Sequence, residues 1–119
     1  MAEQQVPGIK RTNLQRHDLS VPGREVVQSR VDIDPSAPLF KHTHPVFKHT
    51  HPGEEIIYVL EGALEYQIED KPPMTFNAGD VLTVPAGAIH AVRNVGSGNA
   101  AELATYVVEK GKPLLTPAE

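Results

Sequence analysis

Turn signals interrupt this chain about every ten residues from residue 25 onward, and they limit each structural element to a short strand. The signals are glycine-rich or proline-rich stretches at 34–38, 61–62, 70–73, 77–80, 85–87 and 96–99. Between them, apolar residues alternate with polar ones or form short β-branched runs, and no segment has a helical period. The pattern predicts an all-β sandwich or barrel with little or no helix.

The predicted strands cover residues 25–33, 56–60, 64–68, 74–76, 81–84, 89–94 and 102–109. The chain has 119 residues, which suits one domain. We expect a polar N-terminal leader or arm over 1–24, a barrel over 25–109 and a C-terminal tail over 110–119. The tail is partly apolar, so it could pack against the barrel or against a partner subunit.

Charge and composition exclude several classes of protein. The net charge is −4 without a basic cluster, so we expect no nucleic-acid partner. The chain has no cysteine, which excludes disulfides and thiolate metal sites. No apolar run approaches the roughly 20 residues that span a bilayer, so no membrane partner is expected. The polar N-terminus favours a cytoplasmic protein, although a mature periplasmic protein without its signal peptide would look the same.

A short repeat contains most of the histidines. Residues 40–45 and 47–52 both read Phe-Lys-His-Thr-His-Pro, and four of the six histidines lie in them, as His42, His44, His49 and His51. On a strand, side chains at i and i+2 point to the same face, so either pair could bind one ion. The identity of the copies suggests a direct duplication, natural or engineered.

The spacing of the copies means that they cannot both line the interior of one regular strand. A seven-residue shift places the two histidine pairs on opposite faces. Either the second copy binds metal, or the first copy (His42, His44) does so while the following residues bulge out, or the two registers interconvert. We favour the second copy, because only it keeps its spacing to Glu55 and Gly62. Glu54 has the opposite parity and is expected in solvent.

A fourth candidate ligand, His90, lies in the strand that follows Pro85-Ala86-Gly87. Three imidazoles and one carboxylate suit divalent iron, manganese, nickel, copper or zinc, and the ligand set does not choose among these metals.

Two segments with this spacing resemble the motifs of the cupin superfamily. Residues 49–55, continuing to Gly62, resemble the first motif, in which His-x-His is followed by a glutamate and later a glycine. Residues 79–94 resemble the second, with glycine, proline, glycine, histidine and asparagine at the expected spacing. The resemblance implies a small jelly-roll barrel that is often a homodimer. It also implies a metal held by His49, His51, Glu55 and His90.

The resemblance leaves more than one function open. One hypothesis is a metal-dependent enzyme of dioxygenase, decarboxylase, isomerase or lyase type, with a small organic substrate. Such an enzyme would bind its substrate in a small apolar pocket, and we expect that pocket to be lined by Ile57, Val59, Leu64, Tyr66, Leu82 and Val92. No second acid or base is evident, so the chemistry would centre on the metal. The alternatives are a non-catalytic module for a small ligand or metal, and a structural variant that carries a duplicated loop.

Overall fold

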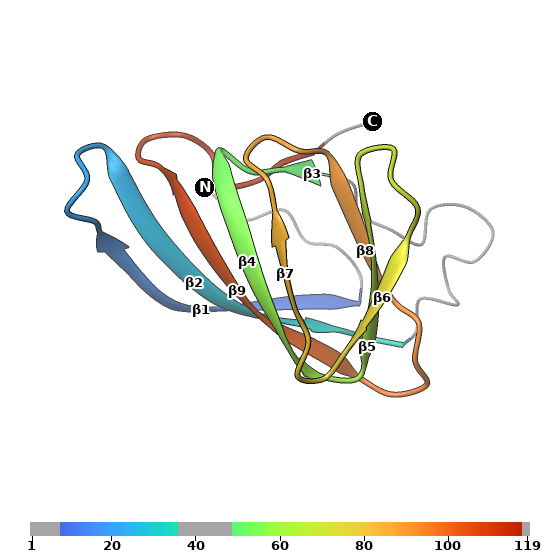
Figure 1. Ribbon diagram of the computed structural model, residues 1–119. Helices are drawn as coiled ribbons and strands as arrows, with labels where there is room; N and C mark the ends of the chain where they lie inside the picture. The colour runs from blue at the N-terminus through green and yellow to red at the C-terminus, as the bar shows by residue number, and fades with distance from the viewer. Residues whose placement is uncertain (1–7, 36–48, 118–119) are drawn as a thin grey trace.

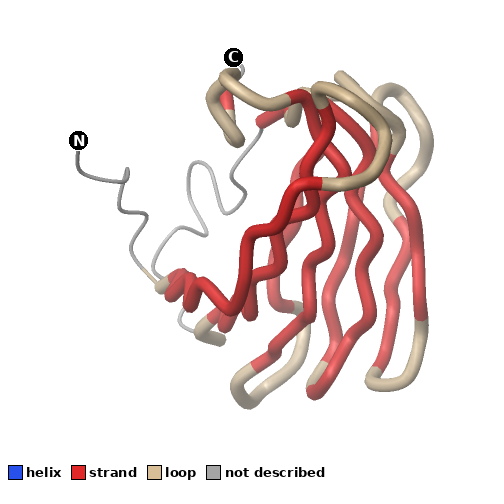
Figure 2. The backbone as a smooth tube through the Cα atoms, turned by 90° about the vertical axis from the view of Figure 1, so that its left-hand side faces the viewer, coloured by secondary structure: helices blue, strands red, loops and turns tan. Residues whose placement is uncertain are grey.

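The computed structural model describes residues 8–35 and 49–117, which form two five-stranded antiparallel sheets (Figure 1). The first sheet has the order β1 (Ile9–Asp18), β2 (Arg24–Ile33), β9 (Ala100–Glu109), β4 (Gly53–Glu61), β7 (Val81–Val84). The second has the order β10 (Thr116–Pro117), β3 (His49–Thr50), β8 (His90–Asn94), β5 (Ala63–Ile68), β6 (Met74–Asn77). The described residues contain no helix, as Figure 2 shows, and the predicted all-β jelly-roll class is confirmed.

The core lies between the two sheets and follows the predicted alternation. In β2, every second residue is buried, so Val27, Ser29, Val31 and Ile33 all point inward as predicted. Other strands of both sheets contribute buried side chains as well. These are Ile57, Val59, Leu64, Tyr66, Val84, Val92, Ala104, Tyr106 and Val108. Burial of this apolar surface is the main force that holds the sheets face to face.

Strand β1 lies in the segment that we expected to be a polar arm. It pairs with β2 from Ile9 opposite Ile33 to Asp18 opposite Glu25, with an irregularity between Asn13 and Gln15. Most of its side chains are exposed, so it has no apolar alternation that a sequence pattern could reveal. Its place in the sheet comes from backbone hydrogen bonds, which any residue except proline can donate.

Asn94, at the end of β8, braces a turn through hydrogen bonds to backbone groups. Its Nδ2 donates to the carbonyl oxygens of Ile33 and Gly98, both at 2.8 Å. Its Oδ1 accepts a hydrogen bond from the backbone N–H of Gly96 at 2.8 Å. The buried amide therefore joins β8 to the end of β2, which belongs to the other sheet.

The chain changes sheets between β3 and β4, at residues 51 and 52. The first histidine copy, with His42 and His44, lies outside the described residues, so its predicted placement is untested. Among residues 8–35 and 49–117, no helix is long and apolar enough to cross a bilayer.

Candidate metal site

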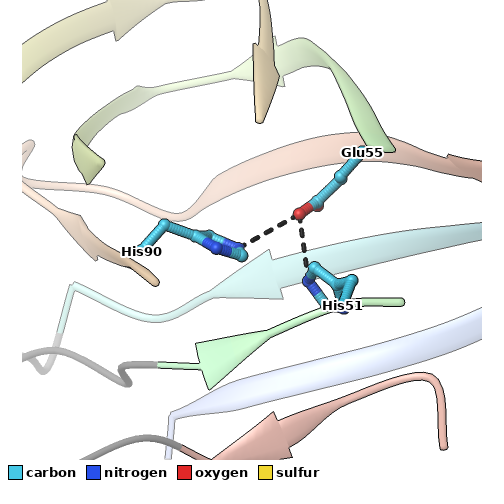
Figure 3. Close-up of side chains that lie close together, drawn as sticks. All are labelled: His51, Glu55 and His90. Carbon is cyan, nitrogen blue, oxygen red and sulfur yellow. Dashed lines mark ion pairs between the residues drawn. The ribbon is translucent and has the colours of Figure 1, made fainter. Parts of the chain in front are cut away.

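Three of the four predicted ligands come together inside the barrel. His51 follows β3, Glu55 lies on β4, and His90 begins β8. The Oε1 atom of Glu55 is 3.1 Å from Nε2 of His51 and 3.2 Å from Nε2 of His90 (Figure 3). All three side chains are almost completely buried, with exposed fractions between 1% and 3%. One ligand atom from each residue lies within 4.8 Å of the others, so the cluster could hold a metal ion.

Each histidine ring is oriented by a backbone carbonyl. Nδ1 of His51 donates to the carbonyl oxygen of Leu114 at 2.7 Å, and Nδ1 of His90 donates to that of Ala88 at 3.0 Å. A carbonyl oxygen only accepts, so each Nδ1 carries a proton. In a neutral imidazole, Nε2 then presents its lone pair, and both Nε2 atoms face Glu55. Such a carbonyl contact is the usual support of a metal-binding histidine.

The charges in the cluster fit a cation. Burial alone would raise the pKa of Glu55, but the hydrogen bonds and positive charge that His51 and His90 supply in their protonated form outweigh it and lower that pKa to about 2. Two imidazole lone pairs and one carboxylate oxygen would repel one another unless a proton or a metal cation lay among them. An ionised carboxylate and two imidazoles are ligands that divalent transition metals accept. The three residues therefore fit the metal that the sequence predicted.

Local backbone geometry brings the ligands to one face. Side chains along β4 alternate, so Glu55 is buried and Glu54 is exposed, as their parity predicted. Gly53 lies between His51 and Glu55, where β4 passes so close to Val107 that a side chain would not fit. The absence of a Cβ at Gly53 thus lets the chain change sheets while both side chains point inward.

The structure leaves some predicted ligands untested. The backbone of His49 lies in β3, directly opposite His90, but its side chain is not among those described. The alternative pair His42 and His44 lies outside the described residues. The choice between the two histidine copies therefore stays a prediction.

The residues predicted to line a pocket belong to the packed core. Ile57, Val59, Leu64, Tyr66 and Val92 are buried, and Leu82 is partly buried against them. One of them lies beside the cluster: the Tyr66 ring is stacked on the His90 ring, with centroids 6.4 Å apart. The others are packed as a hydrophobic wall, and their contact with a substrate remains a prediction.

Sequence reasoning missed a second buried carboxylate, Glu102 of β9. It is 3% exposed and accepts a hydrogen bond from the Tyr66 hydroxyl at 2.5 Å. Burial and the charge of Glu55 raise its pKa to about 8, although the Tyr66 hydrogen bond and the charge of Arg11 oppose the shift. The sequence contained a signal for this burial, because Glu102 lies two and four residues before Ala104 and Tyr106, which face inward on the same strand. The chain therefore has a second acid in the barrel, at a position that the strand parity marks as inward-facing.

Glu102 should make the metal-free protein less stable as the pH rises. Its folded pKa of about 8 lies above the ordinary value of 4.5, so the folded state keeps a proton that the unfolded state releases. Stability from this group is complete below pH about 4.5 and is lost as the pH rises through about 8. In Glu102→Gln, which keeps an acceptor for Tyr66, this loss should disappear. Urea unfolding of both proteins at pH 5, 7 and 9 measures the free energy of unfolding at each pH. If this free energy changed with pH equally in wild type and Glu102→Gln, the raised pKa of Glu102 would be contradicted.

Comparisons with known proteins agree with the geometry. A family model described as a cupin domain matches residues 30–108. Germin-like protein 1-1 of Oryza sativa subsp. japonica is 35% identical over 85 residues, which cover 68% of this chain and 37% of that protein. The chain thus spans well under half of the length of this curated relative.

Solved structures resemble the fold at low identity. An oxalate oxidase in complex with the substrate analogue glycolate superposes with a TM-score of 0.68 and 23% identity, over 97% of this chain and 58% of that chain. The DMSP lyase DddQ from Ruegeria pomeroyi DSS-3 superposes with a TM-score of 0.60 and 24% identity, over 74% and 41% of the two chains. These similarities establish the shared fold and leave the reaction open.

Proposed function

The chain belongs to the family of cupin domains, and on this basis we propose that it is a metal-dependent enzyme acting on a small organic substrate. The reaction would be of dioxygenase, decarboxylase, isomerase or lyase type. One observation carries the proposal: two carbonyl-oriented imidazoles and an ionised carboxylate converge within a buried interior. The metal would be divalent iron, manganese, nickel, copper or zinc.

His49 is the proposed fourth ligand. Its backbone lies opposite that of His90 in the β3–β8 ladder, and residues opposite each other in an antiparallel pair share a face. This register supports a set of His49, His51, Glu55 and His90, which would leave one or two positions open on a six-coordinate ion.

The bound metal would supply a Lewis acid or a redox centre. The protein side chains have separate tasks around it. His51 and His90 keep their Nδ1 protons on backbone carbonyls, which holds each Nε2 toward the interior. Glu55 supplies negative charge, and the surrounding apolar core excludes bulk water.

The solved neighbours support a small substrate. One is named as an oxalate oxidase and another as a DMSP lyase, so this barrel is used by enzymes of small organic compounds. Because this chain spans only part of those proteins, a similar activity is part of the proposal. The expected homodimer also remains a prediction.

Metal content of two double variants should identify the histidine copy that binds. We expect His49→Ala/His51→Ala to lose bound metal, because His51 lies 3.1 Å from the Glu55 carboxylate in the buried cluster. His42→Ala/His44→Ala should retain the wild-type metal content. Elemental analysis of protein purified without added metal measures both. Metal loss in the second variant alone would place the site at the first copy.

Turnover is tested in a second experiment. Protein with its natural metal content would be offered phenols, keto acids, hydroxynitriles and small carboxylic acids, with product detection by mass spectrometry. Turnover that disappears in Glu55→Gln supports the enzyme proposal. Tight ligand binding without any turnover would instead favour a non-catalytic binding module.

A further inference from the structure

The C-terminal tail lies along the short segment that carries two of the predicted ligands. Strand β10 pairs with β3 in antiparallel register, so the tail backbone runs beside residues 49–50. Three residues before the end of that pairing, the carbonyl oxygen of Leu114 accepts the hydrogen bond from Nδ1 of His51 at 2.7 Å. The tail therefore meets each of the three consecutive residues 49–51.

This tail is held to the barrel by a short ladder and by one apolar side chain. β10 has only two residues, whereas β2 and β9 pair along ten residues each. Leu114 is partly buried and packs against the hydrophobic core. The three residues before it, 111–113, are exposed. A segment with so few buried contacts opens at a lower free energy than the long strands of the core.

A metal ion can reach the buried cluster only if some part of the barrel moves, because the ligand side chains are 1% to 3% exposed. Glu55 lies on β4, which is paired on both sides, with β7 and with β9. His90 lies on β8, which pairs with β5 along five residues. His51 instead follows the two-residue strand β3, and its ring is held by the tail. The His51 side of the cluster is therefore the side that opens most readily.

We propose that residues 111–117 form a latch that controls the exchange of metal at the site. In the closed state, the Leu114 carbonyl holds the His51 ring with its Nε2 toward Glu55. When the latch opens, His51 loses this support and can turn away from the metal, so the ion enters or leaves. The Leu114 carbonyl is thus a positioning group, and the Leu114 side chain keeps it in place. This inference rests on the proposed metal-dependent function.

Removal of the apolar anchor should speed the release of metal. Full-length wild type and Leu114→Ala would be loaded with Zn²⁺ and mixed with an excess of a chromogenic chelator. We expect release to be about 10- to 100-fold faster in Leu114→Ala, the range in which loss of a group that supports a ligand lowers metal affinity. Leu115→Ala is the matched control, because Leu115 is also partly buried but is not among the residues packed against the core. It should release Zn²⁺ at the wild-type rate.

Proton exchange at the two histidine rings separates a latch from a general loosening of the barrel. Nuclear magnetic resonance of ¹⁵N-labelled protein measures how fast each Nδ1 proton exchanges with solvent. In Leu114→Ala, this exchange should be faster at His51 and unchanged at His90, whose Nδ1 donates to Ala88 instead. Equally faster exchange at both rings, or no change at His51, would contradict the latch.

A reversible crosslink tests the opposite change, in which the latch is held closed. Thr50 and Thr116 are directly opposite in the β3–β10 pair. The Cα atoms of such residues lie about 4.5 to 5.5 Å apart, which a disulfide can span. Because the chain has no cysteine of its own, the bond in Thr50→Cys/Thr116→Cys would be specific. The oxidised protein should release Zn²⁺ more slowly than the same protein after reduction.

Two negative results have different meanings. Zn²⁺ release at one rate in wild type and Leu114→Ala, or in the oxidised and reduced crosslink variant, would overturn the latch and leave the metal site standing. Wild-type protein that binds neither Zn²⁺ nor Mn²⁺ would overturn the metal site and the latch together.

Discussion

Glu55→Gln is expected to lower metal affinity by at least about 100-fold. Replacing a residue that only hydrogen-bonds to a metal ligand typically lowers metal affinity by about 10- to 100-fold, and replacing the ligand itself should cost more. Both histidine Nε2 atoms face Oε1 of Glu55, at 3.1 Å for His51 and 3.2 Å for His90. Glutamine keeps the size of the side chain but removes its negative charge. Metal retained after dialysis against a weak chelator measures the effect. The thermal stabilisation that metal gives to the folded state should disappear as well.

The neighbouring residue provides the matched control. Glu54 has the same chemistry, lies one position earlier on β4, and points into solvent. Glu54→Gln should therefore keep the wild-type metal content and thermal stability. Equal metal loss in the two variants would mean that the acidic character of the segment matters rather than the buried carboxylate. Full metal retention in Glu55→Gln would remove Glu55 from the ligand set.

Gly53→Ala should destabilise the protein by about 3 kcal/mol or more, a size that core overpacking reaches. An added Cβ would lie 2.0 Å from the carbonyl oxygen of Val107 and 2.7 Å from the Cα of Val108. Both are backbone atoms of β9, so the clash can be relieved only by moving β4 away from its partner strand. Urea unfolding of this small domain gives the change in the free energy of unfolding.

Gly98→Ala is the control for this substitution. A Cβ at Gly98 would meet nothing within 4 Å, so its effect should stay within about 0.5 kcal/mol. Gly53 lies between His51 and Glu55, so a shift of β4 should also reduce metal content in Gly53→Ala. Equal stability of the two variants would show that β4 and β9 can separate at this point with little cost.

Sequence pattern predicts the parts of the fold that have an apolar alternation. All seven predicted strands exist, with bounds that differ by a few residues. The parity of the residues in β4 also correctly separates the buried Glu55 from the exposed Glu54. These predictions succeed because strand side chains alternate strictly between two faces, and one face must be apolar to be buried.

Features without that alternation could not be predicted. Strand β1 is polar and mostly exposed, and backbone hydrogen bonds that do not depend on side chains hold it to β2. The sequence pattern therefore places these residues in a polar arm outside the barrel. Glu102 escapes prediction because a carboxylate is rarely buried, even though its neighbours on β9 alternate.

By itself, the sequence determined an all-β jelly roll and included His51, Glu55 and His90 among four candidate ligands, because periodicity and motif spacing can be read directly from the order of the residues. Only the tertiary structure decided that these three side chains converge, since His51 and Glu55 flank a change of sheet and His90 comes from a distant strand. It also decided that the carbonyl of Leu114, from the C-terminal tail, orients His51. Contacts between residues far apart in the chain depend on how the strands pack, and no local pattern encodes them.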